Sequence, residues 1–103
     1  MKKDVRDFVS SLNSRKFTNN TQRVLFALLG ALKESDDGWI SLDKLRVNSA
    51  GARVRDLRKS QFGSFDVQCR SASRLDRRGT RHTFYYRLAQ RNLSVSKLRK
   101  VFM

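Results

Sequence analysis

Residues 48–60, which read Asn-Ser-Ala-Gly-Ala-Arg-Val-Arg-Asp-Leu-Arg-Lys-Ser, decide the fold. The first two, Asn48 and Ser49, are typical of a turn followed by the N-cap of a helix. Ala50, Val54 and Leu57 follow at spacings of four and three, so they share one face of a helix. We therefore predict a helix over residues 50–60 that packs this face against a core.

The opposite face of this predicted helix is polar. At about 100° per residue it carries Ser49, Ala52, Asp56, Lys59 and Ser60, with Arg53 and Arg55 on its two flanks. An α-helix fits the major groove of B-DNA, where arginine pairs with guanine O6 and N7. We expect Arg53 and Arg55 to contact bases or phosphates and Lys59 to contact phosphate, with Ser49 and Ala52 at the same surface.

Asp56 has two interpretations on this helix. Its carboxylate could accept a hydrogen bond from a cytosine amino group. It could instead form an i,i+3 ion pair with Arg53 or Lys59, and we favour this intrahelical pair.

Upstream, two further helices are predicted. A short amphipathic helix over about residues 3–13 follows from Val5, Phe8, Val9 and Leu12. A second helix, capped by Asn20 or Thr21, is apolar nearly all round and should be central. After a turn at residues 35–38, Trp39-Ile40 indicates a short strand, and Ser41 is a candidate N-cap for a helix of one or two turns.

Downstream of residue 60, apolar residues recur at every second position, which is typical of β-strands. Residues 65–70 and 82–88 alternate as strands, with Phe65, Val67 and Cys69 on the inward side of the first. Residues 75–80 form an arginine-rich hairpin tip in which Gly79 can take a positive φ. A last amphipathic helix begins at about Ser94.

The charge indicates the class of partner. The 103 residues hold 23 Lys plus Arg and 9 Asp plus Glu, a net charge of +14, and residues 53–91 alone contribute +8. Such an excess opposes folding through self-repulsion and favours a polyanionic partner, above all nucleic acid. Four arginines gather at the hairpin tip: Arg74, Arg77, Arg78 and Arg81. They suit a phosphate backbone or a minor groove, although charged tips also discourage edge-to-edge pairing of strands.

Several classes of protein are unlikely from composition. No apolar run is long enough to span a membrane, and the N-terminus becomes charged before any secretory signal could form, so we expect a cytoplasmic protein. One cysteine excludes a disulfide framework, and one histidine removes most metal and triad chemistry. We therefore expect no enzyme, metal or cofactor.

We also expect Cys69 and Tyr86 to be buried, Trp39 to lie in the core, and Tyr85 to be the candidate for base stacking.

The order of helix, short strand, short helix, turn, helix and hairpin resembles the winged helix-turn-helix family from about Thr21 to Leu88. It is similar to small bacterial and phage domains in which a helix reading Arg-x-x-Asp-Leu-Arg precedes a glycine and a hairpin closing on aromatic-Arg-Leu. The resemblance implies an α+β fold, a three-helix core with a β-hairpin wing, to which the chain adds terminal amphipathic helices. The expected divisions are an N-terminal helix and connection (1–20), a winged-helix domain (21–90) and a C-terminal helix (91–103).

The function that this resemblance implies is binding of double-stranded DNA by a small sequence-preferring transcriptional regulator or repressor. The alternatives are a non-specific architectural or bridging protein, an RNA-binding module, and a protein-binding module such as a phage inhibitor. The terminal helices could form a homodimer or dock on their own domain, and either arrangement explains their apolar stripes.

Overall fold

A computed structural model describes the protein except for residues 36, 77–78 and 92, and describes residues 73–76 and 80–82 by their backbone alone. The described part is a mixed α+β fold with four α-helices and one antiparallel three-stranded sheet in the order β1-β3-β2. The helices are α1 (Lys3–Ser11), α2 (Asn20–Glu34), α3 (Ala50–Leu57) and α4 (Val95–Phe102). The strands are β1 (Ile40–Ser41), β2 (Val67–Asp76) and β3 (Gly79–Leu88). Short 3₁₀ turns lie at η1 (Ser14–Lys16), η2 (Leu42–Leu45) and η3 (Ser60–Phe62).

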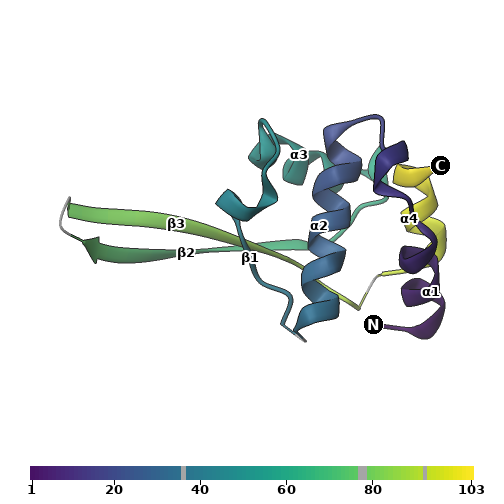
Figure 1. The fold of residues 1–103 in the computed structure, drawn as a ribbon, viewed down its shortest axis with the longest axis horizontal. Coiled ribbons are helices and arrows are strands. Elements are labelled where there is room, and N and C mark those ends of the chain that lie inside the picture. Colours follow the sequence, from purple (N-terminus) through teal and green to yellow (C-terminus); the bar gives the residue numbers. More distant parts are fainter. Residues whose placement is uncertain (36, 77–78, 92) are drawn as a thin grey trace.

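Helix α2 lies at the centre of the helical body, as its apolar pattern predicted (Figure 1). Its most deeply buried residues are Val24, Leu25, Leu28 and Leu29. The predicted N-cap, Asn20 or Thr21, is wrong by one or two positions. The cap is Asn19, whose side-chain oxygen accepts a hydrogen bond from the Gln22 amide at 2.9 Å, while Gln22 Oε1 accepts from the Thr18 amide at 2.7 Å.

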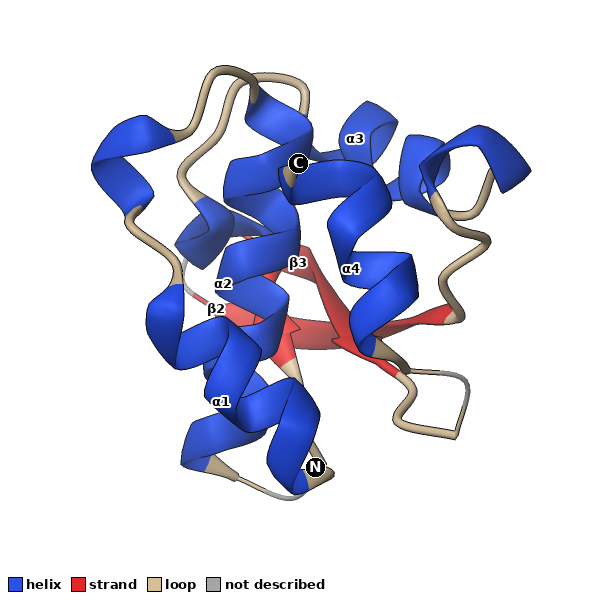
Figure 2. Cartoon of the chain, turned by 90° about the vertical axis from the view of Figure 1, so that its right-hand side faces the viewer, coloured by secondary structure: helices blue, strands red, loops and turns tan. Residues whose placement is uncertain are grey.

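The terminal helices α1 and α4 pack on the same chain. Val5 and Val9 from α1 and Leu98 and Val101 from α4 are all buried in the common core. Gln22 of α2 fixes α4 in place, because its Nε2 donates to the Val101 carbonyl at 2.9 Å. Figure 2 shows these helices in front of the strands. The apolar stripes of the two terminal helices, which could have formed a homodimer or packed on their own domain, therefore pack within the chain.

The connection between α2 and α3 is tight. Strand β1 is Ile40–Ser41, one residue later than predicted, and the short helix after it is the single 3₁₀ turn η2. Ser41 occupies the predicted cap position without a side-chain hydrogen bond. Arg46 (φ 49°) and Ser49 (φ 58°) both take left-handed backbone conformations, which reverse the chain before α3.

Helix α3 ends at Leu57, three residues before the predicted end at Ser60. The Leu57 carbonyl accepts from the Phe65 amide at 2.8 Å, so it is not available to continue the helix. The chain instead turns through η3 and Gly63 (φ 106°), which brings Phe65 into the core. Lys59 consequently lies beyond the helix rather than on it.

Strands β2 and β3 form a long two-stranded ribbon. Their register runs from Val67 opposite Leu88 to Asp76 opposite Gly79, so the strands are longer and the tip shorter than predicted. Gly79 has the expected positive φ (110°). The ribbon projects past α3, away from α1 and α4, and gives the molecule its 45 × 26 × 25 Å shape (Figure 1).

Candidate nucleic-acid interface

The core face of α3 is confirmed. Ala50, Val54 and Leu57 are buried, which fixes the rotation of the helix and leaves its other side outward. Of the predicted contact residues, Ser49, Arg55 and Lys59 are exposed, whereas Ala52 and Arg53 are half-buried. Ser49 occupies the N-cap position, but its side chain makes no capping hydrogen bond because its backbone is left-handed.

Asp56 forms the intrahelical pairs that we favoured. Its Oδ2 lies 3.1 Å from Arg53 Nε, and its Oδ1 lies 3.3 Å from Lys59 Nζ. The contact with Arg53 is an ion pair without hydrogen-bond alignment, since that buried Nε has no hydrogen-bond partner in the described part of the chain. One carboxylate therefore neutralises part of the charge of two predicted DNA contacts.

Arg55 has fewer internal contacts than Arg53 and Lys59. Its side chain is exposed and makes no hydrogen bond or ion pair with any residue that the structure describes. It lines a groove of about 360 Å³ between α3 and the ribbon, together with Ala52, Cys69 and Tyr86. Neighbouring Arg58 is not comparable, because its Nε and Nη2 both donate to the Val67 carbonyl and tie the end of α3 to β2.

Tyr86 forms part of the wall of this groove. Burial raises the pKa of its hydroxyl above the usual 10.0, and interaction with the Cys69 thiol raises it further. The positive charges of Arg58 and Arg55 oppose this shift. The hydroxyl is therefore a neutral hydrogen-bonding group at the edge of the candidate interface.

The hairpin-tip arginines fall largely outside what can be described. Arg77 and Arg78 lie outside the described residues. Arg74 and Arg81 are directly paired across the ribbon by their backbones, and their side chains lie outside the described part. The common surface of these arginines with α3 stays a prediction.

Two arginines that we did not single out lie on the outer face of the sheet. Val67 and Leu88 are buried under the helices, so the alternate positions, including Arg70 and Arg87, lie on the opposite face. The guanidinium carbons of Arg70 and Arg87 lie 4.3 Å and 4.7 Å from the centroid of the Trp39 ring. The alternation of the strands could have predicted that the two arginines share the outer face. It could not have predicted Trp39 beside them, because that contact depends on the pairing of β1 with β3.

Three burial predictions are wrong. Cys69 is exposed, Trp39 is half-buried on the outer sheet face, and Tyr86 is only half-buried. Phe84, in phase with Tyr86, is 45% exposed. Cys69 and Tyr86 border the open groove between α3 and the ribbon, Trp39 points away from α2, and Phe84 lies farther along the ribbon toward its tip. Tyr85 is half-buried, and the Arg70 guanidinium carbon lies 5.5 Å from its ring centroid.

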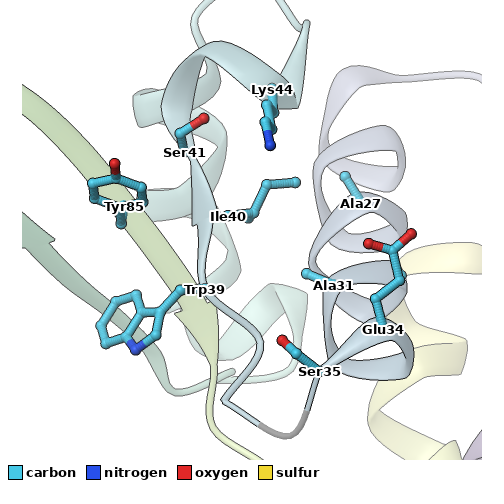
Figure 3. Close-up of a pocket in the computed structure, with 10 residues that line it drawn as sticks. Ala27, Ala31, Glu34, Ser35, Trp39, Ile40, Ser41, Lys44 and Tyr85 are labelled. Carbon is cyan, nitrogen blue, oxygen red and sulfur yellow. The ribbon is translucent and has the colours of Figure 1, made fainter.

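A second hollow, of about 380 Å³, lies between α2 and β1 (Figure 3). Small residues of α2 form one wall, Ile40 points toward them, and Trp39 points away. Lys44 and Glu34 stand at its rim. Within the described residues no three His, Cys, Asp or Glu side chains gather as metal ligands, and no helix is long and apolar enough to cross a membrane.

Comparisons of the chain with models of protein families, with curated proteins and with solved structures find no match, so its function is argued from its own residues and geometry.

Proposed function

We propose that the protein binds double-stranded DNA, with α3 in the major groove and the ribbon on the phosphate backbone or in the minor groove. Its role would be that of a small sequence-preferring transcriptional regulator. The chain order α2, β1, η2, α3, β2, β3 and the sheet order β1-β3-β2 support a winged helix-turn-helix interpretation of the fold.

The proposal rests mainly on the exposure of Arg55 and on its lack of an internal counter-ion among the described residues. It is an exposed arginine on a helix whose apolar face is fully buried, and none of the described carboxylates neutralises it. A guanidinium held in this way has its planar array of donors available to a guanine edge or a phosphate. The net charge of +14 supplies the long-range attraction to a polyanion.

The proposal takes a single chain as the binding unit. The apolar stripes of α1 and α4 are buried against α2, so a homodimer through them would have to open this packing. Affinity must then come from α3 and the ribbon together rather than from paired half-sites.

Selection of bound sequences from a random duplex pool at physiological salt tests the proposal. We expect an enriched motif, and we expect Arg55→Gln to lose about 1–3 kcal/mol on it and to relax preference at one position. Arg6→Gln removes the same charge from the exposed side of α1 and serves as the matched control. The ribbon variant Arg78→Ala should weaken every duplex alike and reduce the salt slope by about one unit.

Two results would contradict this assignment. Equal losses for Arg55→Gln and Arg6→Gln would mean that only net charge matters. Binding without an enriched motif would point to the architectural alternative, and preferential competition by structured RNA would point to an RNA-binding module.

A further inference from the structure

The outer face of the sheet presents a second cationic surface, separate from α3. It consists of Arg70 and Arg87 against Trp39, and we refer to these three residues as the outer-face cluster. Both arginine distances are measured to one ring centroid, so the two guanidinium carbons lie within their sum, 9.0 Å, of each other. Gln68 Oε1 accepts a hydrogen bond from Arg87 Nε and orients that side chain.

This arrangement is preorganised for an anion. The cation–π contacts with the Trp39 ring hold both guanidinium groups in place, and each group has more N–H donors than these contacts and the hydrogen bond to Gln68 use. Neither arginine forms an ion pair with any carboxylate that the structure describes. Two like charges around one ring repel each other, and a phosphodiester backbone, whose successive phosphates offer many acceptor oxygens, relieves that repulsion by accepting from each guanidinium group.

The position of the cluster identifies which phosphate it would bind. Val67 and Leu88 lie under the helices, and Arg70 and Arg87 lie on the other side of the same strands, near the base of the ribbon. A straight duplex seated against α3 is separated from this face by the sheet itself. An anion at the outer-face cluster therefore comes from a different stretch of nucleic acid.

We infer that the outer-face cluster binds the phosphodiester backbone of a second DNA segment, so that a single chain bridges two duplexes. This inference rests on the proposed function, because α3 is taken to hold the first duplex. It adds to that function a second, sequence-independent contact, since the cluster presents charge and planar donors to phosphates rather than to base edges.

A bridging assay tests the inference with the full chain. One duplex is immobilised on beads, an identical dye-labelled duplex is added at physiological salt, and its capture through the protein is measured. Arg70→Gln combined with Arg87→Gln should reduce capture by about 30-fold, because two phosphate contacts are lost and each is worth about a factor of 5.5 at 0.15 M relative to 1 M salt. Affinity for one duplex in dilute solution should change far less.

Two single variants separate geometry from net charge. Arg70→Lys keeps the charge but loses the planar fork and the stacking area, so it should also reduce capture. Arg6→Gln removes one charge from α1 and should leave capture within about twofold of the parent, because it lies outside both surfaces. Arg70→Lys also provides the test if the double variant does not fold.

Each remaining outcome is decisive. Tight single-duplex binding without capture overturns the bridge and leaves the proposed function intact. Capture that survives the double variant, or that Arg6→Gln reduces equally, assigns bridging to another surface or to chain association. Absence of any duplex binding overturns both the proposed function and the bridge.

Discussion

Neutralising Asp56 should strengthen DNA binding. Its carboxylate lies 3.1 Å from Arg53 and 3.3 Å from Lys59, so Asp56→Asn leaves two predicted phosphate contacts without their internal counter-ion. Each additional phosphate contact steepens the plot of log affinity against log salt by about 0.9. One to two contacts correspond to about 5- to 30-fold tighter binding at 0.15 M salt. These pairs are partly exposed, at 36% for Arg53, 19% for Asp56 and 58% for Lys59, and surface ion pairs are worth about 0.2–1 kcal/mol each, so the variant should remain folded.

The assay is a titration of dye-labelled duplex at a series of salt concentrations, for the parent and for Asp56→Asn. Asp66→Asn is the matched control, because it removes the same charge by breaking a 3.3 Å pair with Arg91 outside α3. We expect a smaller gain for the control than for Asp56→Asn.

Two results would refute this reasoning about Asp56. An unchanged salt slope would mean that Arg53 and Lys59 do not reach phosphates. Weaker binding, with lost discrimination at a cytosine, would mean that the carboxylate reads a base edge, which is the interpretation that we did not favour.

Four further outcomes follow from the packing. Gln22→Leu should reduce the free energy of unfolding by about 1–3 kcal/mol in denaturant titrations, because the buried Val101 carbonyl loses its donor. Gly63→Ala should cost about 1–3 kcal/mol in the same measurement, because φ is 106° and a Cβ would lie 3.0 Å from a ring carbon and 3.3 Å from a carbonyl oxygen. In Tyr85→Phe, tyrosinate absorbance should titrate with a midpoint above 10.0, since burial raises the pKa of Tyr86. The stability that the protonated Tyr86 hydroxyl contributes is complete below pH 10 and is lost as pH rises through its folded pKa, so Tyr86→Phe should flatten this alkaline decline.

The order of the helices and the apolar faces was accessible from sequence, because periodicity reports which side of an element is apolar. Val54 and Leu57 show this for α3, and the all-round apolar character of α2 correctly indicated a central helix. The intrahelical pairing of Asp56 was equally accessible, since residues three apart on a helix are neighbours.

Periodicity does not report how far a covering layer extends. Cys69 and Phe84 follow the same alternation as the buried residues of their strands, yet Cys69 lies in the open groove beside α3 and Phe84 lies farther along the ribbon. The end of α3 depended on a hydrogen bond from Phe65, eight residues later, which no local pattern encodes. The outer-face cluster required the pairing of β1 with β3, a contact between residues more than forty positions apart.

The position of Trp39 gives the protein an intrinsic optical probe. It is the only tryptophan in the sequence, and two guanidinium groups lie within 5 Å of its ring centroid. Indole emission is sensitive to nearby charge and solvent, so displacement of either arginine should alter its intensity and wavelength. Occupancy of the outer sheet face can thus be followed on the unlabelled protein, while events confined to α3 leave this signal nearly constant.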